Sequence, residues 1–151
     1  MTTDPFLEED FRVLTPEAFE FVLTNELKRA VRSQNFITLV LMEPNAGDRA
    51  AAVREIAGLV SRELRETDLL ATDEQTVSLV LLDADIQSSA RVIERVMSRL
   101  EHYQFTAPVD IQVGAACCPT HGADIETLKR VAREARTGLP RRDGRGNAHA
   151  Q

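Results

Sequence analysis

Arg65 and Asp68 are the residues whose types and spacing point most directly to ligand chemistry. A guanidinium presents a planar fork that fits paired acceptors such as those of a phosphate, and a carboxylate can accept from N–H donors. Both residues lie near the predicted end of a helix, where they can equally pair with each other on its surface. Because an Arg-x-x-Asp motif arises readily by chance in an arginine-rich chain, both interpretations stay open.

Three further groups resemble sites but have simpler structural interpretations. His121 lies in a loop without a neighbouring Cys, Asp or Ser arrangement, so we interpret it as a turn residue rather than a base. Asp83 and Asp85 lie between a predicted strand and a predicted helix, where capping is a commoner role than metal binding. Tyr103 and Phe105, near the end of that helix, are interpreted as packing residues.

Length and charge narrow the class of protein. The chain has 151 residues, enough for one compact domain with its own core. Its formal charge of −6 argues against binding to nucleic acid or to an anionic membrane, because phosphate-rich surfaces require clustered cations. The basic cluster near the C-terminus is interpreted as part of a terminal tail rather than a binding arm. It comprises Arg136, Arg141, Arg142 and Arg145.

The two cysteines, Cys117 and Cys118, are adjacent in the sequence. Neighbouring side chains on a strand point to opposite faces, so a disulfide between them would be strained. The sequence contains no Cys/His spacing typical of metal sites, no signal peptide and no apolar run of membrane-spanning length. We therefore expect reduced thiols in a cytoplasmic protein with no metal, no cofactor and no membrane contact.

Hydrophobic periodicity predicts the elements that position these residues. They are a helix from Thr15, a strand at 36–42, a helix with a buried face from Val53 to Leu64, strands at 68–72 and 76–82, a helix at 86–101, a strand at 109–116 and a helix at 125–135. Residues 44–48 are expected to end the first strand, with Asp48 capping the next helix. Residues 73–75 suit a hairpin turn.

This order predicts an α+β fold of the ferredoxin-like β-α-β-β-α-β type. Right-handed crossovers place the first and third strands side by side at the centre of an antiparallel sheet. We expect helices to cover one face of that sheet. Residues 14–138 form the predicted domain, between an N-terminal extension at 1–13 and a flexible tail at 139–151.

The segment from Arg65 to Leu82 resembles the GGDEF family of diguanylate cyclases, with its signature replaced. In that family an Arg-x-x-Asp motif shortly precedes a Gly-Gly-Asp/Glu-Glu-Phe hairpin, and Glu74 to Ser78 occupy that register here. Other segments of this chain are also similar to family landmarks. They are 14–19, 26–32, Val113-Gly114-Ala115, 119–124 and Asp143-Gly144-Arg145-Gly146-Asn147. The resemblance covers roughly residues 13–147 and implies a nucleotidyl-cyclase-type sheet.

The resemblance also implies that the catalytic parts are lost. The glycines that let backbone approach a phosphate are absent from residues 74–78, as are both carboxylates. Glu43 matches a metal-binding Asp of the family, but a single carboxylate makes a poor site. About ten residues of the GTP-contacting segment are missing after the first strand. We therefore expect no enzyme activity.

The same resemblance assigns a ligand to the Arg65 and Asp68 pair. In the family these positions bind an intercalated cyclic di-GMP dimer, and a second arginine from the helix after the hairpin completes the site. Arg95 fits that position in register. The expected function is a catalytically inactive receptor that binds cyclic di-GMP through Arg65, Asp68 and Arg95. The alternative is a nucleotide-independent module for protein interaction or dimerisation, with Arg95 on a solvated helix face.

Overall fold

The computed structural model describes residues 13–139. Of the predicted extension and tail, only Val13 and Leu139 are described, and both are buried. The segment 143–147, which resembles the terminal motif of the family, lies outside the described residues, as do Arg141 and Arg142.

The described elements form a single six-stranded sheet with four helices. In chain order they are β1 (Val13–Leu14), α1 (Pro16–Ser33), β2 (Ile37–Ala46), α2 (Arg49–Ser61), β3 (Leu69–Thr72), β4 (Val77–Leu82), α3 (Ile86–His102), β5 (Val109–Cys118), α4 (Ile125–Glu134) and β6 (Thr137–Gly138). The sheet order is β1-β3-β4-β2-β5-β6. The α+β prediction is confirmed, with β2 between β4 and β5 as expected. Beyond the predicted strands, β1 joins one edge in parallel with β3, and β6 joins the other edge.

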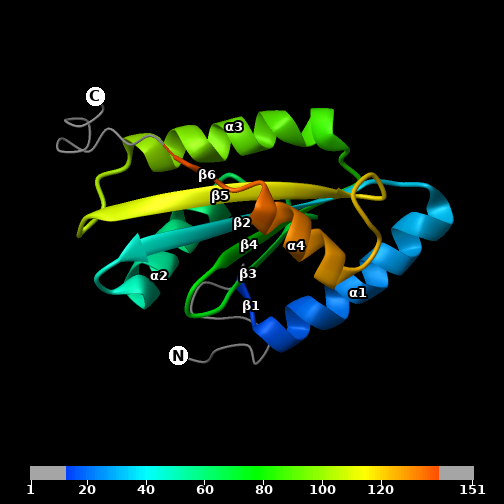
Figure 1. The fold of residues 1–151 in the computed structure, drawn as a ribbon, viewed down its shortest axis with the longest axis horizontal. Coiled ribbons are helices and arrows are strands. Elements are labelled where there is room, and N and C mark those ends of the chain that lie inside the picture. Colours follow the sequence, from blue (N-terminus) through cyan, green and yellow to red (C-terminus); the bar gives the residue numbers. More distant parts are fainter. Residues whose placement is uncertain (1–12, 140–151) are drawn as a thin grey trace.

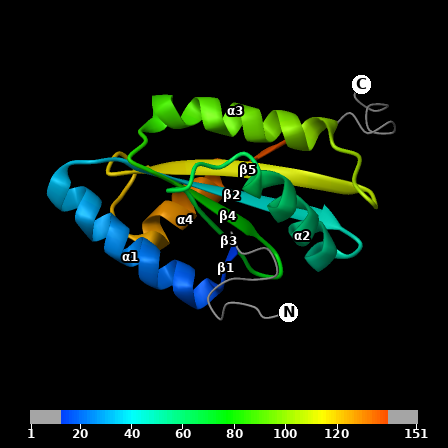
Figure 2. The same ribbon diagram turned by 180° about the vertical axis from the view of Figure 1, so that it is seen from behind.

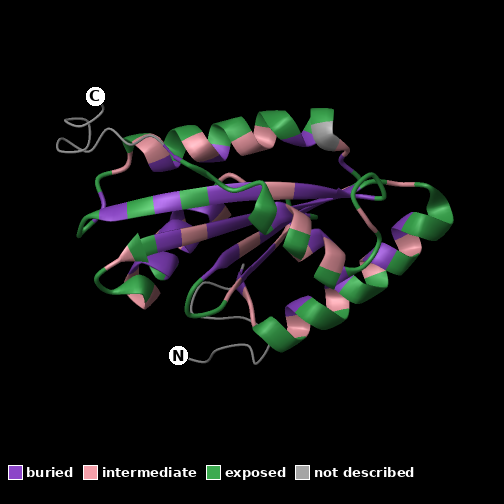
Figure 3. Cartoon of the chain, in the orientation of Figure 1, coloured by how far each residue is buried: buried purple, intermediate pink, exposed green. Residues whose placement is uncertain are grey.

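Helices cover both faces of the sheet, so the expectation of a single covered face was wrong (Figures 1 and 2). Alternate residues of β2 enter two separate cores: Val40 and Met42 pack with α2 and α3, and Leu39 and Leu41 pack with α1 and α4. A strand that is apolar on both faces requires cover on both. Figure 3 shows the result, with buried residues along the strands and exposed residues on the outer faces of the helices.

Strand β2 continues four residues beyond its predicted end at Met42. Its pairing with β4 stops at Met42 opposite Val77, but its pairing with β5 continues to Ala46. Beyond Met42 one side of β2 is therefore an edge of the sheet, where a proline such as Pro44 is tolerated. The extension matters for function because it carries Glu43 and Asn45 onto the sheet.

Each helix begins at a side-chain cap. Thr15 and Asp48 accept from the backbone N–H groups of Ala18 and Ala51, at 3.3 and 3.1 Å, as predicted. Asp85 and Asp124 cap α3 and α4 in the same way, each at 2.8 Å. These contacts fix where each helix starts relative to the strand before it.

The predicted hairpin is confirmed. Ala71 lies opposite Ser78 in an antiparallel pair formed by β3 and β4. The carboxylate of Asp73 closes the turn by accepting from the backbone N–H groups of Gln75 and Thr76, at 2.7 and 2.8 Å. An Asp side chain thus stabilises this turn, which contains no glycine.

Candidate functional site

Arg65 and Asp68 contact each other in the segment that connects α2 to β3. The guanidinium donates to both carboxylate oxygens, from Nη2 to Oδ1 at 2.9 Å and from Nε to Oδ2 at 3.4 Å. The backbone N–H of Arg65 also donates to Oδ2 at 3.0 Å. The side chain of Asp68 is 0% exposed, whereas that of Arg65 is 51% exposed. The carboxylate is therefore enclosed, and the guanidinium lies between it and solvent.

Arg65 also fastens the segment to the sheet. Its Nη2 donates to the carbonyl oxygen of Leu82 at 3.1 Å, at the end of β4. The hydrogen bond to Asp68 raises the pKa of Arg65, so the guanidinium keeps its charge at any ordinary pH. Arg65 can thus present a fixed positive charge to a ligand, but Asp68 must give up an internal contact before it can accept from a base.

Arg95 lies on α3 and contacts Glu63 rather than Asp68. Its Nε donates to Glu63 Oε1 at 3.1 Å, and its Nη2 donates to the Glu63 carbonyl oxygen at 2.9 Å. Arg99, one turn further along α3, donates from Nε to Glu63 Oε2 at 2.8 Å. Glu63 precedes Arg65 by two residues. The two predicted arginines are therefore linked through the same connecting segment, residues 62–68.

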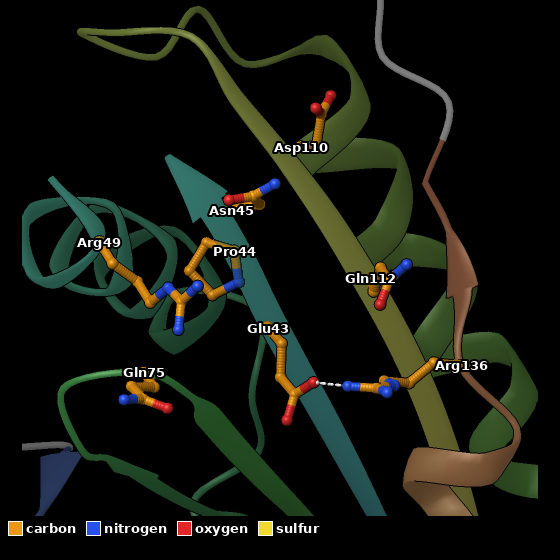
Figure 4. A pocket seen from close by; sticks show the side chains of 8 residues that line it. All are labelled: Glu43, Pro44, Asn45, Arg49, Gln75, Asp110, Gln112 and Arg136. Atoms are coloured by element: carbon orange, nitrogen blue, oxygen red, sulfur yellow. Dashed lines mark hydrogen bonds and ion pairs between the residues drawn. The ribbon is translucent and has the colours of Figure 1, made fainter. Parts of the chain in front are cut away.

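A second polar region lies near the end of β2 and contains Glu43. It is a cavity of about 560 Å³ on the α4 side of the sheet, at the C-terminal end of β2 and the N-terminal end of β5 (Figure 4). Its lining residues are Glu43, Pro44, Asn45, Arg49, Gln75, Asp110, Gln112 and Arg136. Glu43 pairs across the sheet with Gln112, and Asn45 with Asp110, so these four polar side chains form the floor.

The carboxylate of Glu43 is held by two arginines. Arg133, in the last turn of α4, lies 3.5 Å away through its Nε, and Arg136 donates to Oε1 from the segment after α4. Figure 4 shows Glu43 turned toward Arg136, with Asp110 further along β5. Two guanidiniums repel a divalent cation from this position.

The cation implied by the family therefore does not fit here. Among residues 13–139, no three His, Cys, Asp or Glu side chains gather in an arrangement able to hold a metal ion. The carboxylate of Glu43 is already paired with two arginines, and the other carboxylate of the cavity, that of Asp110, lies away from it on β5. Mg²⁺ sites instead require oxygen ligands with negative charge to spare.

Asp85, His121, Tyr103 and Phe105 have the structural roles predicted for them, whereas Asp83 lies in the turn after β4 with a left-handed backbone (φ 56°) and is not the N-cap of α3. Asp85 caps α3, and the hydrogen bonds from Ser88 lower the pKa of its carboxyl. His121 Nδ1 accepts from the backbone N–H of Cys117 at 2.8 Å, within the turn after β5. Tyr103 and Phe105 pack edge to face, with ring centroids 4.7 Å apart. Cys117 and Cys118 are buried free thiols.

Glu63, Arg99 and Arg133 were not predicted as partners in these two regions. Arg136 was interpreted as part of a terminal tail, and that interpretation was wrong because Arg136 contacts Glu43. The spacing of Arg95 and Arg99, one helical turn apart, was a usable signal for a shared partner. Nothing in the local sequence pointed from Arg133 to Glu43, because 90 positions separate them.

No helix among the described residues combines the length and apolarity required to cross a bilayer.

We compared the sequence and the fold with those of known proteins. No protein-family model matches the sequence, and no functionally curated protein does. A solved DGC protein of Thermotoga maritima superposes with a TM-score of 0.71 at 16% identity, over 89% of this chain and 100% of that chain. The GGDEF domain of DgcB from Caulobacter crescentus, solved with c-di-GMP, gives 0.70 at 12% identity, over 89% and 87%.

A third neighbour is the diguanylate cyclase SiaD of Pseudomonas aeruginosa, solved in complex with its activator SiaC. It gives a TM-score of 0.66 at 19% identity, over 87% of this chain and 56% of that chain. At these identities the likeness establishes architecture. This chain has the fold of the GGDEF domains of diguanylate cyclases.

Proposed function

We propose that this chain is a non-catalytic GGDEF-like domain that binds cyclic di-GMP through Arg65, Asp68 and Arg95. The observation that carries the proposal is the contrast between its two polar regions. The cavity at Glu43 is closed to a divalent cation by Arg133 and Arg136. Arg65 in the segment 62–68 and Arg95 on α3 instead present half-exposed guanidiniums that can donate to phosphate or guanine, beside the carboxylate of Asp68, which can accept from guanine.

The lack of catalysis follows from the chemistry of the cavity. Cyclisation of GTP requires a cation to offset phosphate charge and to position the attacking hydroxyl. The carboxylate in the metal position is paired with arginines, and the hairpin turn is an Asp73 turn without glycine. Both features remove groups that would bind a nucleoside triphosphate.

Purified protein is therefore expected to form no cyclic di-GMP from GTP with Mg²⁺ or Mn²⁺. Product is measured by chromatography against a buffer blank and an active cyclase run in parallel. The Arg133→Ala/Arg136→Ala double variant is expected to stay inactive too, because the glycine hairpin and the GTP segment are still missing. Product above the blank from the wild-type protein would contradict this part of the proposal.

The receptor role rests on charge and geometry. Charge-assisted hydrogen bonds contribute about 1.5–3 kcal/mol each. A Kd of 1 μM requires about 8 kcal/mol, and three such contacts give about 4.5–9 kcal/mol before the cost of association is subtracted, so they supply only part of the net free energy. A stacked ligand dimer or a second protomer must provide the rest. Binding is therefore expected to be linked to self-association of the protein.

Calorimetry with cyclic di-GMP is expected to give a Kd in the micromolar range or below, without competition from GTP. Arg95→Ala should weaken binding at least ~10-fold, because it removes a phosphate-binding fork. Arg91→Ala, an exposed position on the same helix, is the matched control for loss of one charge and should change the Kd less than ~3-fold. Sedimentation should show ligand-dependent dimers. Absence of heat and of self-association at ~100 μM ligand, about 5.5 kcal/mol, contradicts the receptor role.

A nucleotide-independent interaction module is the second candidate, and one observation favours it. Phe21 and Val31 on α1 are 72% and 52% exposed, and Phe36 just beyond α1 is 39% exposed. Large exposed apolar side chains on one helix and next to its end suit a protein contact. The structural neighbour SiaD was solved in complex with its activator SiaC. Concentration-dependent dimerisation that Phe21→Ser abolishes, in the absence of any nucleotide, would favour this function over the receptor.

A further inference from the structure

Glu63 carries a largely enclosed carboxylate at the start of the segment 62–68. Its two oxygens contact the Nε atoms of Arg95 and Arg99, at 3.1 and 2.8 Å. The Glu63 side chain is 13% exposed, whereas the Arg95 and Arg99 side chains are 50% and 56% exposed. The single carboxylate of Glu63 therefore partly neutralises the charges of two guanidinium groups. About half of each arginine side chain remains exposed to solvent.

The contact uses the edge of the arginine that a phosphate would use. A guanidinium binds carboxylate and phosphate oxygens with the same donors, because both ligands present paired acceptors. Arg95 directs Nε to the Glu63 carboxylate and Nη2 to the Glu63 carbonyl, so Glu63 takes the side edge of its fork. A phosphate that binds along this edge must displace the carboxylate.

We infer that the Glu63 carboxylate occupies, between Arg95 and Arg99, the position that a phosphate of cyclic di-GMP takes on binding. The inference rests on the proposed receptor function and deepens it. Glu63 is then an internal competitor that sets the affinity of the site. Arg99, which no sequence motif indicated, is a further phosphate-binding residue.

The energetics allow such a competitor to be displaced. Ion pairs between half-exposed arginines and a carboxylate contribute little to stability, because water competes for the same groups. An incoming phosphate diester restores a charge-assisted contact to each arginine. The cost of releasing Glu63 is therefore small, but it subtracts directly from ligand affinity.

Calorimetry on the full chain with cyclic di-GMP tests this inference. Glu63→Gln keeps the shape of the side chain but removes its charge, and is expected to tighten binding about 5- to 10-fold. Glu66→Gln removes the same charge from an exposed position in the same segment, and should change the Kd less than ~2-fold. Arg99→Ala should weaken binding at least ~5-fold. Thermal melts of each variant confirm that it remains folded.

The outcomes separate this inference from the receptor function. Wild-type binding that Glu63→Gln leaves unchanged or weakens would overturn the internal competitor and leave the receptor standing. Equal gains from Glu63→Gln and Glu66→Gln would also overturn it, since the effect would then be general charge. No binding by the wild-type protein or by Glu63→Gln would overturn both. A gain confined to Glu63→Gln, with a loss in Arg99→Ala, supports both.

Discussion

Gly114→Ala is expected to lower the free energy of unfolding by about 3 kcal/mol or more, at the upper end of overpacking effects. A Cβ at Gly114 would lie 1.9 Å from the carbonyl oxygen of Ala132 and 3.2 Å from the backbone nitrogen of Arg136. Both neighbours are backbone, so no side-chain rotation can make room. Strand β5 and helix α4 would have to separate. Urea denaturation measures the loss as a lower midpoint at constant slope.

The matched control is Gly58→Ala in the interior of α2. A Cβ at Gly58 meets nothing within 4 Å. Alanine there should be stabilising by roughly 0.5–1 kcal/mol, because glycine costs conformational entropy in a helix. Loss of stability in both variants to the same degree would contradict the close-approach argument.

The consequence of Gly114 extends to the cavity. The contact between β5 and α4 sets the position from which Arg133 and Arg136 reach Glu43. Val113-Gly114-Ala115 is one of the segments that resemble landmarks of GGDEF domains. The structure gives a physical reason for the glycine, since only glycine lets α4 lie directly on β5.

Arg65→Ala is expected to lower the free energy of unfolding by about 2 kcal/mol. The substitution leaves the Asp68 carboxylate, 0% exposed, with the backbone N–H of Arg65 but without its cation. Removing one partner of a fully buried ion pair costs about 3–5 kcal/mol. The value is reduced here because Arg65 is half exposed and water can enter where its side chain was.

Two comparisons make this expectation specific. Arg95→Ala should cost less than ~1 kcal/mol, because Glu63 keeps Arg99 as a partner. Asp68→Asn introduced into Arg65→Ala should restore about 1 kcal/mol, because a neutral amide removes the buried charge and its oxygen still accepts from the backbone N–H of position 65. Urea denaturation of the four proteins measures both effects. Equal costs for Arg65→Ala and Arg95→Ala would show that Asp68 is not the source.

Local physical chemistry in the sequence determined the order of elements, the hairpin and the helix starts. Thr15 and Asp48 were identified as caps because a side-chain acceptor before a helical pattern satisfies N–H groups that have no partner within the helix. The turn at 73–75 followed from residue types between two short β-rich runs. Each of these features depends on residues a few positions apart.

The apolar run at 36–42 predicted a strand buried on both faces, although we expected helices on only one face of the sheet. A strand without polar residues on either side cannot leave one side in water. The extension of β2 past Pro44 was different. It depends on β5 pairing with β2 after β4 has ended, and the residues involved are some 60–70 positions apart.

The partners of the charged residues were decided by tertiary structure alone. The sequence indicated Arg65, Asp68, Arg95 and Glu43 as residue types. It could not indicate that Asp68 is enclosed, that Glu63 lies between Arg95 and Arg99, or that Arg133 and Arg136 hold Glu43. Ion pairs are selected by how α3 and α4 lie against their neighbours. Those positions result from packing summed over the whole core, which no short segment specifies.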